Sequence, residues 1–197
     1  MNSLASTPGR SWLQQLAELD YQDCDDPDEE FLTAFIEAAK DQSMCAGISR
    51  DELQSATRNL WLLLAEAFNN HQISLSLRLE ALESLPGFFE RSAQVETDYT
   101  QPMYYFWDGL VISDPELKDS LLKALAAQLS IDNVYDRGAA LFGLREYSFG
   151  DNARQSVIER FLERQDIDPG NRAAAEDIMR SSRERPGTVV FERRSPS

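Results

Sequence analysis

The side chains in this sequence that could do chemistry are mainly carboxylates. Their densest group lies near the N-terminus and consists of Asp23, Asp25, Asp26, Asp28, Glu29 and Glu30. Such a group can attract and pair with lysine and arginine on another protein. The same residues can also cap a helix and interact favourably with the positive end of its dipole. Both interpretations stay open, because one carboxylate can serve both purposes.

Other catalytic chemistry finds little support. His71 is the one histidine, and it follows two asparagines that end a predicted helix, so we expect a surface or capping role. The metalloprotease, phosphate-loop and dinucleotide motifs are absent, and Cys24 and Cys45 have no metal-binding spacing. A pair of carboxylates acting as acid and base is the remaining catalytic hypothesis. We predict a protein that is not an enzyme, with no catalytic residues, metal or cofactor.

A run of four aromatic residues occupies positions 104–107. One face of a helix or strand cannot bury all four, because consecutive side chains point in different directions. We predict that Phe106 and Trp107 fill a gap between helices. Tyr104 and Tyr105, with Asp108 beside them, are candidate contacts for a partner, because tyrosine combines contact area with a polar tip.

Helix start signals recur along the chain and would position these groups. Asp26 is a candidate cap, with Pro27 in the first turn and Glu29 at the capping-box position, for a helix that continues through Ala39. A second capping box at 49–52 opens a predicted helix over about 50–69. The next helix is expected over about 74–85, ended by Pro86-Gly87. Later helices are expected from 114, over about 133–147, and from 151 and 168.

One motif occurs twice within these helices. Arg137-x-x-Ala140-Leu141-x-x-Leu144 has an earlier copy, Arg78-x-x-Ala81-Leu82-x-x-Leu85, and a degenerate copy begins at Arg172. With residues 157–162 and Asp168-Pro169, this section resembles the closing part of bacterial HEAT-like helical-repeat proteins, over about 72–180. The resemblance implies a right-handed stack of helix pairs that serves as a protein-binding surface and carries no catalytic residues.

These patterns together predict an all-α protein in which antiparallel helix pairs stack as a short HEAT-like α-solenoid. We expect one domain over residues 11–183. Within it, 11–70 would be divergent N-terminal helices and 72–183 the HEAT-like part. Residues 1–10 are expected to be a flexible arm and 184–197 a flexible basic tail.

Charge narrows the classes of partner. The net charge is -15, and residues 1–100 carry 18 Asp and Glu against 6 Lys and Arg. A phosphate backbone would be repelled, so we predict no nucleic-acid partner. The sequence contains no apolar run long enough to span a membrane and no signal peptide, so we expect a cytoplasmic protein without a membrane partner.

Three functional hypotheses follow. The leading one is an immunity or antitoxin-like protein that occludes a basic toxin or effector, with acidic side chains steering the encounter. The alternative is a generic scaffold or adaptor that binds a peptide or helix. The remote alternative is an enzyme that uses a carboxylate pair.

Overall fold

The computed structural model describes residues 11–19, 26–95, 106–107, 110, 115–146 and 151–184, and every regular element in them is helical. This agrees with the predicted all-α class. The α-helices are α1 (Trp12–Ala17), α2 (Glu29–Lys40), α3 (Arg50–Asn69), α4 (Leu75–Ser92), α6 (Pro115–Ser130), α7 (Val134–Glu146), α8 (Asp151–Leu162) and α9 (Pro169–Glu184), and a 3-10 turn, η2 (Ala93–Val95), follows α4.

The predicted helix starts are mostly confirmed, and one is wrong. The capping box of α3 forms as expected, since Ser49 Oγ accepts from the Glu52 N–H while Glu52 Oε2 accepts from the Ser49 N–H. In α2, however, the cap is Asp28 rather than Asp26, and Pro27 lies outside the helix. The Pro27 carbonyl accepts instead from Asn70 Nδ2 at the end of α3, at 3.3 Å. This contact fixes the approach to α2 before the helix begins.

The predicted end of α4 at Pro86-Gly87 is also wrong, because the helix continues through both residues to Ser92. Proline inside a helix removes one hydrogen bond and is unfavourable by itself. The additional turns bury Phe88 and Phe89 completely, and both rings pack on Trp61 of α3. Burial of two aromatic side chains offsets the local cost of proline.

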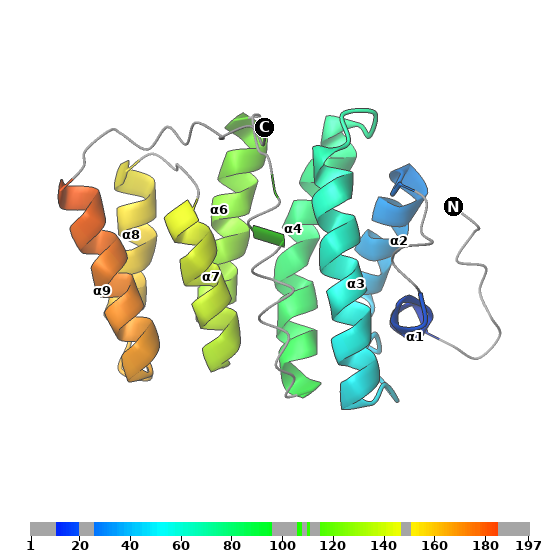
Figure 1. Cartoon of the computed structure of the whole chain (residues 1–197), viewed down its shortest axis with the longest axis horizontal. Coiled ribbons are helices and arrows are strands. Elements are labelled where there is room, and N and C mark those ends of the chain that lie inside the picture. Colours follow the sequence, from blue (N-terminus) through cyan, green and yellow to red (C-terminus); the bar gives the residue numbers. More distant parts are fainter. Residues whose placement is uncertain are drawn as a thin grey trace, which may run out of the picture.

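The longer helices stand side by side in a row that runs from α2 at one end to α9 at the other (Figure 1). Helix α4 packs between α2 and α6, and α8 packs against α6, so these four form one layer. In the second layer α1 packs on α3, and α7 packs on α9. Figure 1 shows α3, α7 and α9 in front of α4, α6 and α8.

Aromatic side chains fill the space around α3. Trp61 and Phe68 of this helix both contact Phe106, with ring centroids 5.4 and 6.1 Å apart. Trp107 contacts Phe106 with the two rings tilted by 53°, and it reaches α7, where a Cβ added to Gly143 would come within 3.4 Å of its ring. Phe106 and Trp107 are fully buried, so the prediction that they fill a gap between helices is confirmed. They bridge α3 and α7 within the second layer.

The first arginine has the same local role in the two full copies of the motif and in the degenerate copy at Arg172, and the sequence did not reveal this role. Arg78, Arg137 and Arg172 are each the fourth residue of their helix, in α4, α7 and α9. Each donates to a backbone carbonyl at the end of the preceding helix or just beyond it: Arg78 Nη1 to Phe68 O, Arg137 Nε to Ile131 O, and Arg172 Nη1 to Leu162 O. These carbonyls have no partner inside their own helix, so the guanidinium groups cap them.

Arg137 makes the largest of these networks. Its Nη1 donates to the Asp166 backbone carbonyl at 2.8 Å, and its Nη2 pairs with Asp166 Oδ2 at 2.8 Å and with Asp132 Oδ1 at 3.2 Å. Arg164 pairs with the same Asp166 carboxylate at 2.7 Å. The network joins the α6–α7 and α8–α9 connections, while the apolar residues of the motif, such as Leu141 and Leu144, are buried in the core.

Candidate acidic interface

The predicted acidic cluster divides into structural and free members where the structure describes it. Asp28 Oδ1 accepts from the Phe31 N–H at 3.0 Å and caps α2. Glu29 Oε1 accepts from the Ser74 N–H at 3.1 Å, which ties the start of α2 to the start of α4. Asp28 therefore caps α2, whereas the predicted capping-box position of Glu29 is wrong, because Glu29 is the first residue of α2 and joins this helix to α4 instead.

The other residues predicted to contact a partner are either exposed or outside the described residues. Asp26 and Glu30 are exposed, and within the described part of the chain neither makes an ion pair. Five predicted partner-binding residues lie outside the described residues: Asp23, Asp25, Tyr104, Tyr105 and Asp108.

Helix α4 contributes acidic side chains that sequence reasoning did not single out. Glu80, Glu83 and Glu90 are exposed, and their spacing places them within one face of the helix, opposite its buried side. On α2, Glu30 and Glu37 are exposed, and their spacing of seven residues places both opposite the buried side of that helix. We call the set Glu30, Glu37, Glu80, Glu83 and Glu90 the α2–α4 acidic face.

Two contacts show that α2 and α4 run side by side in the same direction. Glu29 meets Ser74 where both helices begin, and the Ala39 carbonyl lies close to Gly87 near the end of α2. A Cβ at Gly87 would come within 3.3 Å of that carbonyl, so glycine permits the close approach. The parallel alignment places the glutamates of both helices in two adjacent rows.

Two positive side chains lie beside this face near the end of α2, Lys40 of α2 and Arg91 of α4. Lys40 Nζ pairs with Glu80 Oε1 at 2.9 Å and links the two rows, although both side chains are more than half exposed and such a pair adds little stability. Nearby, hydrogen bonds from Ser43 and then the charge of Arg91 lower the pKa of Asp41. Within the described residues, Glu30, Glu37, Glu83 and Glu90 have no ion-pair partner.

The remaining candidates for chemistry do not combine into a site. His71 is exposed in the connection between α3 and α4. Cys45 is a free thiol whose pKa is raised by burial, which lowers its reactivity. Among the described residues, no three His, Cys, Asp or Glu side chains are placed to hold a metal ion. In the same residues, no helix has the length and apolar content needed to cross a bilayer.

Comparison of the sequence with protein-family models, with curated proteins and with solved structures finds no match.

Proposed function

We propose that this chain is a non-enzymatic protein-binding module whose α2–α4 acidic face receives a basic surface of another protein. The form we favour is an immunity or antitoxin-like protein that occludes a toxin or effector. The observation that carries the proposal is the pair of adjacent glutamate rows, in which Glu30, Glu37, Glu83 and Glu90 have no ion-pair partner among the residues that the structure describes. Unpaired exposed carboxylates are available to lysine and arginine of a partner.

The mechanism is electrostatic steering followed by occlusion. A net charge of -15 attracts a basic protein over a distance limited by salt screening, and raises the association rate. On contact, the glutamates of α2 and α4 pair with the partner's lysine and arginine side chains. Because the two helices are held rigidly by their shared core, the carboxylates lose little conformational freedom in the complex beyond their own rotamers.

The frame we propose for this surface is a short HEAT-like α-solenoid of antiparallel helix pairs. Three observations support it: the helices form two layers, the same-layer helices α2 and α4 run in the same direction, and a carbonyl-capping arginine recurs at the fourth residue of α4, α7 and α9. The alternation between the layers is interrupted between α4 and α6, which lie in the same layer. The two full motif copies nevertheless lie in different layers, since α4 packs with α6, whereas α7 packs with α9. The solenoid proposal therefore rests on packing more than on the sequence motif.

The test compares two charge-reversal variants of equal net charge. Glu83→Lys with Glu90→Lys alters the α2–α4 acidic face, and Glu163→Lys with Glu176→Lys alters exposed positions directly after α8 and on α9, at the far end of the row. A partner recovered by co-purification from the native host is then measured against each by surface plasmon resonance at several salt concentrations. We expect the first variant to associate at least about tenfold more slowly, with a weaker dependence on salt.

Equal association rates for the two variants, or an acidic partner, would contradict the proposal. Co-expression separates its two forms. An immunity protein suppresses the toxicity of its partner in cells, and the Glu83→Lys, Glu90→Lys variant loses that protection. A partner with no toxicity of its own would favour the second candidate, a scaffold or adaptor that binds a peptide or helix. The open groove between α8 and α9 is the observation that favours this candidate.

A further inference from the structure

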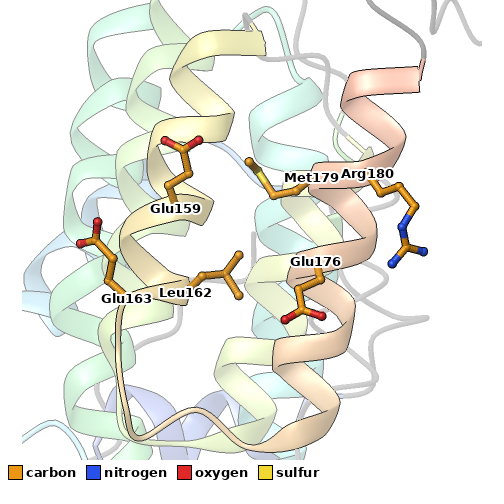
Figure 2. A pocket seen from close by; sticks show the side chains of 6 residues that line it. All are labelled: Glu159, Leu162, Glu163, Glu176, Met179 and Arg180. Atoms are coloured by element: carbon orange, nitrogen blue, oxygen red, sulfur yellow. The ribbon is translucent and has the colours of Figure 1, made fainter.

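A groove with a volume of 610 Å³ runs between α8 and α9. It is lined by Glu159 and Leu162 of α8, by Glu163 directly after α8, and by Glu176, Met179 and Arg180 of α9. Both trios have the spacing i, i+3 and i+4, and the Glu163 N–H still donates to the Glu159 carbonyl, so each trio occupies one helical face. Figure 2 shows Leu162 and Met179 pointing toward one another across the space between the helices, with the rest of the chain behind them.

The rim of this groove is acidic. Glu159, Glu163 and Glu176 are exposed and have no ion-pair partner within the described residues. In Figure 2 Glu163 points away from α9 and Arg180 points away from α8, and Arg180 Nη1 lies 3.4 Å from Asp177 Oδ1. The groove therefore combines an apolar floor with a rim of net negative charge, formed by three carboxylates and one guanidinium group.

We propose that the α8–α9 groove binds an amphipathic helix of a partner protein, with an apolar stripe bordered by lysine and arginine. Two neighbouring helices form a furrow into which the side-chain ridge of a third helix fits. A helix laid along the furrow places apolar residues, spaced by three and four, over Leu162 and Met179. Its flanking basic side chains then meet Glu159 and Glu163 on one side and Glu176 on the other.

The length of the groove sets the size of the docked segment. Helix α8 has 12 residues and spans about 18 Å, which corresponds to some three turns of a bound helix. The site lies at the opposite end of the row from the α2–α4 acidic face (Figure 1). The inference rests on the adaptor form of the proposed function and is independent of that face, so the two can fail separately.

The test uses a designed peptide probe rather than an unknown ligand. The probe is a helical peptide of about 16 residues with a leucine stripe flanked by lysine and arginine, and its control has the same stripe flanked by glutamate. Binding to the full chain is measured by fluorescence anisotropy at low and high salt. The groove variant Glu163→Lys, Glu176→Lys is compared with a control variant of the same net charge, Asp51→Lys, Asp119→Lys, which alters exposed positions on α3 and α6 outside both the groove and the α2–α4 acidic face.

We expect the basic peptide to bind the wild-type chain, the acidic peptide not to bind, and the groove variant to lose about tenfold in affinity, while the control variant keeps wild-type affinity. Circular dichroism checks that both variants are folded, and Met179→Glu provides a second groove variant that should also lose binding. Equal affinity of both double variants for the basic peptide would overturn the proposal, as would equal binding of the two peptides.

The test also separates other occupants of the groove. Residues 185–197 contain both apolar and basic side chains, including Phe191, Arg193 and Arg194. If a chain that ends at residue 184 binds the probe more tightly than the full chain, the chain's own segment occupies the groove and the partner proposal is overturned. If the groove variant changes the sedimentation of the chain from dimer to monomer, the occupant is a second copy, with the same consequence.

Discussion

The two ends of this protein are stabilised by different means. Around α2, α3 and α4 the core is aromatic, and rings such as Trp61, Phe88 and Phe89 touch one another. From α6 to α9 the core is mainly leucine and alanine, and the connections are joined by guanidinium groups, above all that of the buried Arg137. The comparison teaches that one motif, Arg-x-x-Ala-Leu-x-x-Leu, can serve in both surroundings because its arginine needs only carbonyl acceptors.

Arg78 and Arg137 show how the surroundings of the motif set the number of hydrogen bonds that its arginine makes. Among the described residues, Arg78 makes one hydrogen bond, to Phe68 O at 3.2 Å, beside the aromatic core. Arg137 donates to Ile131 O, to Asp166 O and to two carboxylates. The motif places the guanidinium over the end of the preceding helix, and the connecting residues decide whether anions meet it there.

The largest expected effect is the loss of the aromatic centre. Trp61→Ala should lower the free energy of unfolding by about 3–5 kcal/mol, because it leaves a cavity among Phe88, Phe89 and Phe106. Guanidinium denaturation near neutral pH measures this. Trp12→Ala is the matched control, since Trp12 is half-buried at the edge of the same core and should cost clearly less. Equal losses would show that the core is not centred on Trp61.

The next effect tests the arginine networks directly. Arg137→Ala should cost about 2–4 kcal/mol, because it removes several charge-assisted hydrogen bonds from a side chain that is 3% exposed. Arg78→Ala should cost only about 1 kcal/mol, in proportion to its single bond. Arg137→Lys should recover part of the loss, since lysine keeps the charge and lacks the planar fork that reaches several acceptors. The same denaturation measurement applies, and a larger loss for Arg78→Ala would reverse the comparison.

The smallest effect is a dependence on pH that belongs to the C-terminal region. Hydrogen bonds from Arg164 and then from Arg137 hold the pKa of Asp166 well below its ordinary value of 3.8. As the pH falls, Asp166 therefore takes up a proton in the unfolded chain at a higher pH than in the folded chain. The ionised Asp166 stabilises the fold above the unfolded pKa, and this stabilisation is lost as the pH falls through the folded pKa. Thermal unfolding of Asp166→Asn and the wild type should show a difference in Tm near neutral pH that narrows below about pH 4.

A difference in Tm that stays constant down to about pH 3 would contradict this assignment. Added salt should reduce the difference at neutral pH, because Asp166 is half exposed and its ion pairs are screened. Glu80→Gln is a suitable control, since its pair with Lys40 is exposed on both sides and lies in the other region.

The predicted end of α4 and the predicted cap of α2 were both wrong because tertiary contacts overrode local sequence signals. Proline after Leu85 predicts a helix end by local rules, but burial of Phe88 and Phe89 against α3 carries α4 on to Ser92. That error also hid the acidic face, because Glu90 joins Glu80 and Glu83 on one surface only if the helix continues. The cap of α2 moved from Asp26 to Asp28 for a related reason, since Asn70 holds the Pro27 carbonyl outside the helix.

The sequence by itself determined the helical class, the positions of most helices and the capping box at Ser49 and Glu52, because apolar periodicity and side-chain caps act within a few residues. Only the tertiary structure decided that α2 lies parallel to α4, that Phe106 and Trp107 bridge α3 and α7, and that Arg137 meets Asp166. Arg137 and Asp166 are 29 residues apart. Contacts over such separations depend on which helices become neighbours, and local pattern carries no record of that choice.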